Sequence, residues 1–374
     1  MVTFPSPNVH EKELRNATTA SLAVTGWPVP VLDLRTQVAH RYRHTRYLDN
    51  RGEQTGVPLR STQDEFAPEA EQSLRLTLGT HQVVTASGQW RQEILRDEAF
   101  DDPSRTTWAA ALRDQVFFIG DALTFVPAVR YDAVEDVGSQ WSPKFGAAVS
   151  PWRWLTLKGN IGRSFRAPSF TELYFNQGFV EGNPDLKPER ATTGDAGFQL
   201  RAPFLFFENA YFRSDVDDLI EYVLISGFRY RPVNIGEARL EGYEASGRLE
   251  PVEYFSLAGA YTLTYAIDTT DDANRNGRQI PGRPRHTAFG RAEGHWRYFT
   301  PFVEHHYVGG NYVTAANTKL LPERRLWNAG LVTRPDDVFS VGFEIKNLSD
   351  EQAVDVRGFP LPGRAIFITA EAAF

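Results

Sequence analysis

Alternation of apolar and polar residues is the dominant pattern along this chain. Over 255–265 the odd positions are apolar or aromatic apart from Gly259, and the even positions carry Ser, Ala or Thr. The same period of two appears over 339–346 and again over 366–374. A period of two places successive side chains on opposite faces of a β-strand. The pattern therefore predicts an all-β chain.

Seventeen strands are predicted from this alternation and from the turn residues between its segments. They lie near 16–26, 29–43, 71–79, 82–95, 106–119, 122–133, 140–150, 152–166, 188–201, 203–222, 229–250, 253–267, 283–296, 298–308, 324–334, 338–347 and 363–374. A content of 13% aromatic residues and 29 Gly also favours strands and turns over helices.

The connections between these strands alternate between short and long. The short ones are 26–28, 120–121, 202–203, 249–251 and 334–337, and the long ones lie near 44–70, 96–105, 167–187, 268–282, 309–323 and 348–362. Tight turns at one end of a meander and long loops at the other are typical of outer-membrane barrels, whose turns face the periplasm. A propeller would repeat with a blade period, and none is seen. We therefore expect an antiparallel transmembrane β-barrel.

Aromatic residues gather near the ends of the predicted strands. They are Trp27, Trp90, Trp141, Trp152, Trp154, Trp296, Tyr298, Phe299 and Trp327. Trp and Tyr collect where lipid meets water, because the ring is apolar and its N–H or O–H needs a polar partner. The alternative is that these rings form the core of a soluble β protein, and the belt interpretation is favoured.

The number of strands bears on where the chain starts. Single-chain bacterial barrels have even strand numbers, whereas 17 is odd. If the loop 348–362 is extracellular, the last strand runs from the outside towards the periplasm. Because successive strands alternate in direction and 17 is odd, the first strand then also begins outside the cell. The N-terminus also lacks a basic region followed by an apolar stretch, so no signal peptide is visible. We expect that strands, and a domain before them, are missing from the N-terminal side.

Composition excludes several classes of protein. The 374 residues carry a net charge of −7, which gives no reason to expect nucleic acid as a partner. No Cys is present, so disulfides and thiolate metal sites are excluded. No apolar run approaches the ~18 residues of a spanning helix. The mean hydropathy of −0.39 does not separate a soluble protein from a barrel, because only alternate residues of a barrel strand face lipid.

Two neighbouring segments carry a specific motif. The first reads Phe165-Arg166-Ala167-Pro168-Ser169-Phe170-Thr171-Glu172-Leu173-Tyr174, and the second reads Gly182-Asn183-Pro184-Asp185-Leu186-Lys187-Pro188-Glu189. Three more segments follow in order, at 234–244, at 280–286 with Arg283, Pro284 and Arg285, and at 347–364, before the terminal Phe374. Together these segments closely resemble the TonB-dependent outer-membrane receptor family. The resemblance covers 160–374, and the region before about 140 carries no motif.

Glycine and proline have positional meaning within these segments. Pro168, Pro184 and Pro188 cannot donate to a strand ladder, so they mark loops and strand starts. Gly236, Gly242 and Gly247 lie on one long predicted strand, which indicates bends or close backbone approach.

The resemblance implies an architecture and a set of partners. Family members are 22-stranded barrels filled by a plug that precedes the barrel in the chain, and outer-membrane transporters with this strand number have a plugged lumen. The plug carries the segment held by TonB. Residues 1–374 are then one barrel domain, truncated on the N-terminal side, in the outer membrane of a Gram-negative bacterium. Its partners would be outer-membrane lipid and, through the missing plug and its TonB box, the TonB–ExbB–ExbD complex. Without the plug, this chain alone should not perform energised import.

The ligand implied by the resemblance is large and scarce, of the ferric siderophore or cobalamin type. Haem receptors of the family place a ligand His between the two motif segments, and no His lies between Phe165 and Lys187. The predicted ligand contacts are loop residues, because function tends to sit on loops held by a rigid scaffold. They are Tyr174, Phe175, Phe179, Asn311 and Tyr312. The alternative is that these side chains pack the loops against each other.

One loop carries a candidate calcium site. Asp272, Asn274 and Asn276 supply oxygen atoms at alternate positions, and Gly277 follows as in the first half of a calcium loop. The twelfth position, where a bidentate Glu is needed, is Arg283. A solvated turn rich in Asp and Asn explains the same residues. No other cofactor is predicted.

No enzyme motif is present, since the chain lacks GxSxG, HExxH and a Walker loop, and no enzymatic role is expected. Three alternatives to a receptor remain open. They are a passive pore of the same barrel pattern, a soluble or surface β protein such as an adhesin, and a non-functional receptor fragment.

Overall fold

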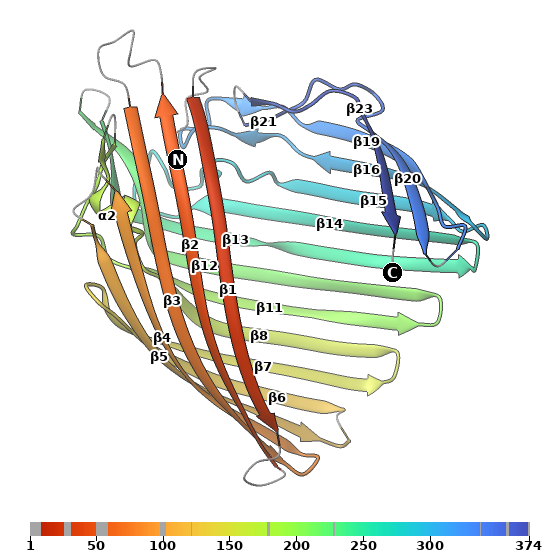
Figure 1. Ribbon diagram of the computed structural model, residues 1–374, viewed down its shortest axis with the longest axis horizontal. Coiled ribbons are helices and arrows are strands. Elements are labelled where there is room, and N and C mark those ends of the chain that lie inside the picture. Colours follow the sequence, from red (N-terminus) through yellow and green to blue (C-terminus); the bar gives the residue numbers. More distant parts are fainter. Residues whose placement is uncertain are drawn as a thin grey trace. The chain divides into compact units, whose positions relative to one another are not determined.

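A computed structural model describes residues 9–25, 31–49, 59–97, 102–120, 122–177, 180–226, 229–336, 338–356 and 359–372. Strands dominate this part of the chain (Figure 1). Its only helix is the five-residue α2 (Phe170–Tyr174). None of the helical structure in these ranges is long and apolar enough to span a membrane.

The long strands are β1 (Val9–Thr25), β2 (Leu32–Asp49), β3 (Leu59–Leu78), β4 (Gln82–Asp97), β5 (Ser104–Phe118), β6 (Leu123–Val134), β7 (Gly138–Trp152), β8 (Leu155–Arg166), β11 (Glu189–Ala202), β12 (Leu205–Ser226), β13 (Arg229–Val252), β14 (Phe255–Asp268), β15 (His286–Gly294), β16 (Phe299–Val308), β19 (Arg324–Thr333), β20 (Phe339–Lys346) and β23 (Ala365–Ala372). Strands of two or three residues lie in the loops: β9 (Asn176–Gln177), β10 (Val180–Glu181), β17 (Asn311–Tyr312), β18 (Leu320–Leu321), β21 (Val354–Val356) and β22 (Phe359–Pro360). The long strands match the predicted strands one for one.

Among the described residues, nineteen strands belong to one sheet, and its long strands pair in antiparallel fashion with their neighbours in the chain. A single parallel contact joins β10 and β13, at Val180 and Tyr230. The pairs β17–β18 and β21–β22 form two small separate sheets. The predicted antiparallel all-β fold is therefore confirmed.

Two compact units can be distinguished within the chain. The first comprises Met1–Ala148, Asn160–Thr193 and Asp215–Glu237. Its strands β1 to β6 pair in sequence, with an uninterrupted register of 17 residue pairs between β1 and β2. It also contains α2 and a small buried cluster of Leu173, Leu186 and Ile220.

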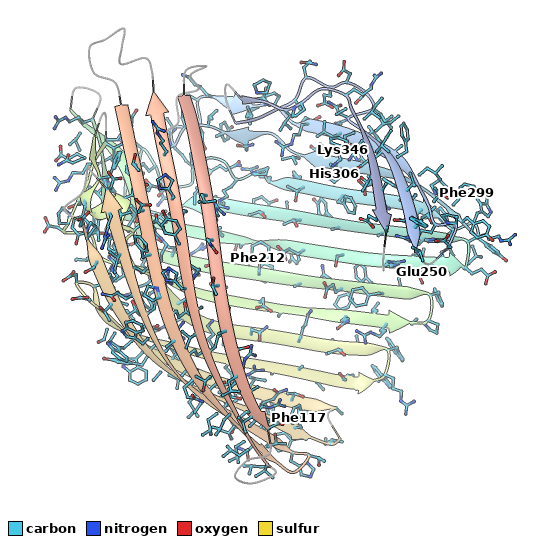
Figure 2. The ribbon with its side chains drawn as sticks, viewed as in Figure 1. Phe117, Phe212, Glu250, Phe299, His306 and Lys346 are labelled. Carbon is cyan, nitrogen blue, oxygen red and sulfur yellow. The ribbon has the colours of Figure 1, made fainter. Side chains whose placement is uncertain are left out.

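The second unit comprises Val149–Gly159, Gly194–Ser214 and Ala238–Phe374. Within it, β14, β15, β16, β19, β20 and β23 pair in order along the chain. Side chains project from both faces of these strands (Figure 2). Register and alternation together put Arg291, Glu304 and Asn328 on one face, and Val303 and Trp327 on the other.

The apolar face of the strands is exposed rather than packed into a core. In the second unit, the exposed fractions are 38% for Val303, 42% for Phe343 and 75% for Ile368. The polar face carries ion pairs such as the one between Arg291 and Glu304. Exposed apolar residues on alternate strand positions are the arrangement of a membrane barrel, and they would promote aggregation of a soluble protein.

The strand-end aromatics also lie at the surface, which contradicts the alternative of a soluble core. Exposed members of the set are Trp141, Trp152, Trp154, Trp296, Tyr298, Phe299 and Trp327. Trp90 is half-buried and pairs with Trp108, their ring centroids being 6.4 Å apart. Trp27 lies outside the described residues.

Two sequence-based expectations were wrong. The long link predicted at 44–70 is mostly strand, because β2 extends to Asp49 and β3 begins at Leu59. Charged residues on both faces of these strand ends hid the alternation, and Pro68 interrupted it. The segment 167–187 was expected to be a loop throughout, yet it contains α2.

Candidate functional site

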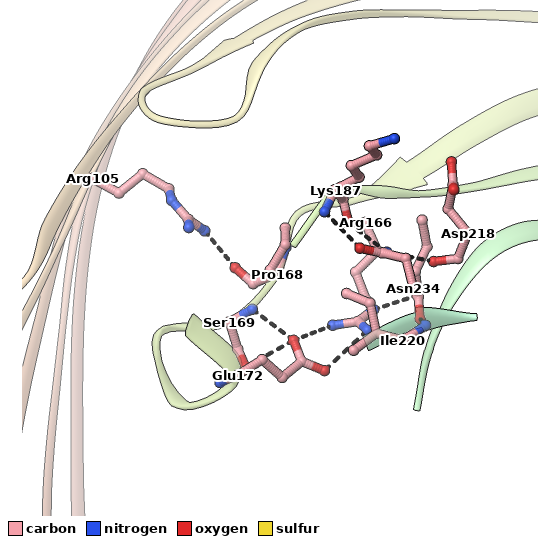
Figure 3. Close-up of polar contacts among 10 residues, drawn as sticks. Arg105, Arg166, Pro168, Ser169, Glu172, Lys187, Asp218, Ile220 and Asn234 are labelled. Atoms are coloured by element: carbon pink, nitrogen blue, oxygen red, sulfur yellow. Dashed lines mark hydrogen bonds and ion pairs between the residues drawn. The ribbon is translucent and has the colours of Figure 1, made fainter. Parts of the chain in front are cut away.

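The candidate site is the segment 167–188 between β8 and β11, here called the braced loop (Figure 3). It lies in the first unit and carries α2 and most of the two motif segments. The helix starts with a capping box. The Ser169 hydroxyl accepts a hydrogen bond from the backbone N–H of Glu172 at 3.2 Å, and the Glu172 carboxylate accepts one from the backbone N–H of Ser169 at 2.8 Å. Both bonds satisfy backbone groups that a helix start leaves free. The sequence Ser-x-x-Glu therefore fixes where α2 begins.

Arg166, at the end of β8, connects the helix to β11. Its Nη1 and Nη2 lie 2.9 and 3.1 Å from the two carboxylate oxygens of Glu172, and its Nε lies 2.5 Å from Glu189. The second Glu189 oxygen accepts the backbone N–H of Ile220 in β12 at 2.8 Å. One guanidinium thus joins three elements by charge-assisted hydrogen bonds, which is the geometry that favours Arg over Lys.

The charge network shifts the ionisation of Glu172. Burial by itself raises the pKa of this carboxyl group, because it disfavours the charged form. Hydrogen bonds from Arg166 and from Ser169 outweigh that effect, so the pKa of Glu172 lies below its ordinary value of 4.5. Glu172 therefore remains charged at neutral pH and holds α2 in place.

Two asparagine amides hold the second motif segment. Asn234 in β13 accepts the backbone N–H of Lys187 at 2.7 Å and donates to the carbonyl oxygens of Lys187 and Asp218 at 2.9 and 2.8 Å. Asn183 donates to the carbonyl oxygen of Pro232 at 2.9 Å. Each amide combines a donor and an acceptor, so it can pair with backbone groups on both sides. These bonds fix residues 183–187 against β13.

Arg105, at the start of β5, attaches the braced loop to another strand. Its Nη1 donates to the carbonyl oxygen of Pro168 at 2.8 Å, and its guanidinium carbon lies 5.1 Å from the centre of the Phe170 ring. Arg105 is only 6% exposed, and Pro168 is fully buried. A buried Arg must have its donors satisfied, so this contact is a specific feature of the loop.

The predicted ligand contacts fall into two groups, of which the first lies in the braced loop. Tyr174 is partly buried against the cluster of Leu173, Leu186 and Ile220, and its ring stacks on Phe170 with centroids 6.3 Å apart. Phe175 directly follows the helix, and its backbone N–H donates to the carbonyl oxygen of Thr171 at 3.2 Å. Phe179 lies outside the described residues, and so does the terminal Phe374.

The second group, Asn311 and Tyr312, forms β17 in the second unit, where the two residues pair with Leu321 and Leu320. The Tyr312 carbonyl accepts the backbone N–H of Gly282 at 2.9 Å, so the loops around 282 and 312 are joined. The three motif residues Arg283, Pro284 and Arg285 follow this contact. Of these, Arg285 lies over the ring of Tyr265, 5.6 Å from its centre.

The loop predicted to bind calcium is held by bonds of its own. Asp272 accepts the backbone N–H of Asn274 at 2.9 Å, and the Asn276 amide donates to the Thr270 carbonyl at 3.2 Å. The nearby Asp268 pairs with Arg275 at 2.7 Å. Among the described residues, no group of three or more His, Asp or Glu could hold a metal ion. Calcium binding by Asp272, Asn274 and Asn276 stays a prediction.

Arg105 was not found by sequence reasoning, because the region before 140 has no motif and burial of one Arg leaves no local pattern. The capping box was visible in the sequence as Ser169-x-x-Glu172. Asn234 was noted within a motif, but its role depends on a contact 47 residues away in the chain. The groups of this network hold the loop in one conformation; the Ser169 hydroxyl, for example, donates to the Glu172 carboxylate at 3.0 Å as part of the helix cap.

These observations define an all-β protein of antiparallel strands with an exposed apolar face and a braced loop between two strands. The family model described as TonB dependent receptor-like, beta-barrel, matches residues 9–348. The chain therefore belongs to the TonB-dependent receptor β-barrel family.

Known proteins resemble the chain over much of its length. It is 26% identical over 299 residues to the Vitamin B12 transporter BtuB of Vibrio vulnificus (strain CMCP6), covering 76% of this chain and 46% of that protein. It is 26% identical over 232 residues to the Hemin receptor of Yersinia enterocolitica, covering 50% and 33%. The solved structure of the Ferric-Catecholate import receptor Fiu from K12 E. coli superposes with a TM-score of 0.79 at 15% identity, covering 99% of this chain and 65% of that one. The chain thus spans less than half the length of these two curated relatives.

Proposed function

We propose that this chain is the barrel part of an outer-membrane receptor that takes up a scarce, large nutrient with energy from TonB. The observation that carries the proposal is the family match over 9–348, on strands whose exposed apolar positions alternate with polar ones. The alternation supports a membrane location, because lipid covers one face of each strand while the other face remains polar.

The braced loop supports a role in binding at the long-loop end of the strands. Its position is fixed by Arg105, Arg166 and Asn234, which come from β5, β8 and β13. A loop held from several strands offers its remaining side chains in a defined arrangement, which lowers the entropy lost when a ligand binds. Tyr174 and Phe175 are the described side chains of this loop that we propose as ligand contacts.

The proposed ligand class is a ferric siderophore or a cobalamin. Relatives named as a vitamin B12 transporter and a ferric-catecholate import receptor support this class. The chain has the same sequence identity, 26%, to a relative named as a hemin receptor as to the vitamin B12 transporter. Haem is not favoured here, because no His lies between Phe165 and Lys187 to serve as an axial ligand.

Uptake by cells that carry the natural gene tests the proposal. The gene would be deleted and restored, and uptake of radioactive iron supplied as a panel of siderophores, and of radioactive cobalamin, would be measured. We expect the deletion to abolish uptake of one of these ligands, and expect the same loss when TonB is inactivated.

Loss with the gene but not with TonB would indicate a passive pore instead. Full uptake of every ligand in the deletion strain would contradict the receptor proposal. Replacement of Tyr174 by Ala is then expected to raise the half-saturating ligand concentration without changing the amount of protein in the membrane fraction.

A further inference from the structure

A separate feature of the first unit lies on one face of β1 to β4, strands that follow one another in the sheet (Figure 1). Their registers pair even-numbered residues with even-numbered residues throughout, so the even-numbered side chains of the four strands share one face. Near the end of β2, the described side chains on this face include the cations Arg46 and Arg96 and the acid Asp64.

On the opposite face of the same strands, three arginines each form an ion pair with a carboxylate of that face. The pairs are Arg41 with Glu69, Arg43 with Glu65, and Arg91 with Glu93. Two others there, Arg35 and Arg75, form no ion pair with a described residue. Arg46 and Arg96 are exposed, and neither forms an ion pair with another described residue. Two guanidinium groups without such partners attract anions.

The side chains around these two cations form a defined surface, here called the basic patch, of His40, Tyr42, His44, Arg46, Phe66 and Arg96. The Tyr42 and Phe66 rings lie 5.1 Å apart, and the Arg96 guanidinium carbon lies 5.5 Å from the centre of Phe66. Arg is well suited to bind phosphate groups, and its guanidinium also stacks on aromatic rings.

Asp64 interacts electrostatically with Arg96, but it forms no ion pair with either arginine of the patch. Its Oδ1 atom accepts the Tyr42 hydroxyl at 2.7 Å and lies 2.8 Å from Nδ1 of His44. The carboxylate thus orders the aromatic floor of the basic patch, while the guanidinium groups of Arg46 and Arg96 can donate to an external acceptor.

The same face becomes apolar farther along the strands. Leu22, Val38 and Leu74 lie on it and are 65%, 55% and 40% exposed. A soluble anion would need only the cations, whereas an amphiphile with a charged head and acyl chains fits both parts. The arrangement is that of a protein wall crossing from hydrocarbon into headgroups.

We propose that the basic patch binds the phosphate-bearing headgroup of a membrane lipid, whose acyl chains lie along Val38 and Leu74. The inference rests on the membrane location given in the proposed function. It adds a lipid site on the apolar face of β1 to β4, distinct from the braced loop and from uptake of the nutrient.

Lipid binding to the natural protein tests this proposal. The protein would be extracted from membranes in a non-ionic detergent and titrated with diphosphoryl lipid A, and bound lipid would be counted by native mass spectrometry. We expect the double variant Arg46→Gln/Arg96→Gln to bind about 30-fold more weakly, since each basic residue near a lipid surface contributes a factor of about five.

Two further variants serve as matched controls. Arg35→Gln removes the same charge from the opposite face of β2, where Arg35 is exposed, and is expected to leave lipid binding unchanged. Asp64→Asn removes the acid from beside the basic patch but keeps an acceptor for Tyr42, and is expected to tighten binding about fivefold. This expected gain is opposite in sign to the loss expected if the substitution merely disordered the basic patch.

Three outcomes would overturn the lipid site. They are equal binding by the protein and its double variant, an equal loss in Arg35→Gln, and displacement of lipid by inorganic phosphate at millimolar concentration, which would indicate a soluble anion. Failure of the protein to fractionate with membranes would instead contradict the proposed function, so the two failures are distinguishable.

Discussion

The Arg166 guanidinium binds both carboxylate oxygens of Glu172, at 2.9 and 3.1 Å, and so connects the end of β8 to the first turn of α2. The two residues are six positions apart in the sequence, and Glu189 extends the pair to β11. Because the side chains of Glu172 and Glu189 are each only 13% exposed, water competes weakly for their oxygen atoms.

Arg166→Lys is expected to loosen the braced loop while leaving the strands folded. Lysine keeps the charge but lacks the planar guanidinium, which binds both oxygens of Glu172 and also reaches Glu189. Arg166 is 45% exposed, so solvent screening reduces the expected loss of loop stability to about 1 kcal/mol. Faster amide hydrogen exchange of residues 170–175 in the variant would show this loss of loop stability.

Arg163→Lys is the control for this change. Arg163 lies in the same strand, three residues earlier, and is exposed. In Arg163→Lys, the amide hydrogen exchange rates of residues 170–175 are expected to equal those of the unaltered protein. Equal exchange rates in the protein and in Arg166→Lys would show that the bidentate pair does not hold the helix.

The braced loop is also expected to loosen in acid. The pKa of Glu172 is lowered in the folded protein, so its charged form stabilises the loop above the ordinary pKa of 4.5. That contribution is lost as pH falls through the lower folded pKa, when the carboxyl group takes up a proton. Proteolysis within 167–187 by an acid-active protease is expected to accelerate below pH 4.5.

Glu172→Gln provides the test of this assignment. The variant has no charge to lose, so its loop should be loose at neutral pH and should change less on acidification. Glu181→Gln, which removes the carboxylate partner of the exposed Arg229, is the control and should keep the original profile. An unchanged pH profile in Glu172→Gln would assign the acid sensitivity to another group.

Arg105→Gln is expected to destabilise the first unit. The substitution removes the bond to the Pro168 carbonyl and the contact with Phe170, and leaves a buried acceptor without its donor. A loss of about 1–3 kcal/mol in the free energy of unfolding is expected. The midpoint of urea unfolding in detergent measures it.

Arg113→Gln is the matched substitution for comparison, because Arg113 lies on the same strand and is exposed. Its unfolding midpoint should shift little. An equal shift in both variants would mean that charge on β5, and not the contact with the loop, determines stability.

Most of the fold could be predicted from the sequence, since alternation is a local property. The strand predicted near 253–267 shows a period of two over 255–265, and the structure has β14 at Phe255–Asp268. Prediction failed over 44–70, where β2 and β3 extend past the apolar part of the chain. There both faces are polar, so the period of two carries no hydrophobic signal.

Prediction of the candidate site was less complete. The motif identified Arg166, Glu172 and Glu189, but their mutual contacts depend on how the loop folds back between β8 and β11. The helix could have been predicted from the capping box of Ser169 and Glu172. The role of Arg105 could not have been predicted, because it depends on a contact with Pro168, 63 residues away in the chain.

The glycines predicted to allow close backbone approach give the sharpest test of the strands themselves. A Cβ atom added to Gly242 would lie 1.8 Å from the Leu263 carbonyl oxygen and 3.0 Å from Cζ of Phe212. Leu263 lies in β14 and Gly242 in β13, and the two strands are paired at these positions. Moving either residue to make room would break the β13–β14 ladder. Gly242→Ala is therefore expected to cost about 3 kcal/mol or more.

Gly290→Ala is the matched control within the same unit. A Cβ atom at Gly290 would meet nothing within 4 Å, and alanine restricts the unfolded chain more than glycine does. Its stability should therefore stay the same or rise by about 0.5–1 kcal/mol. Both variants would be compared by the fraction of protein that migrates as the folded, heat-modifiable form. Equal folded fractions would mean that the close approach of β13 to β14 at Gly242 is absent in the natural protein.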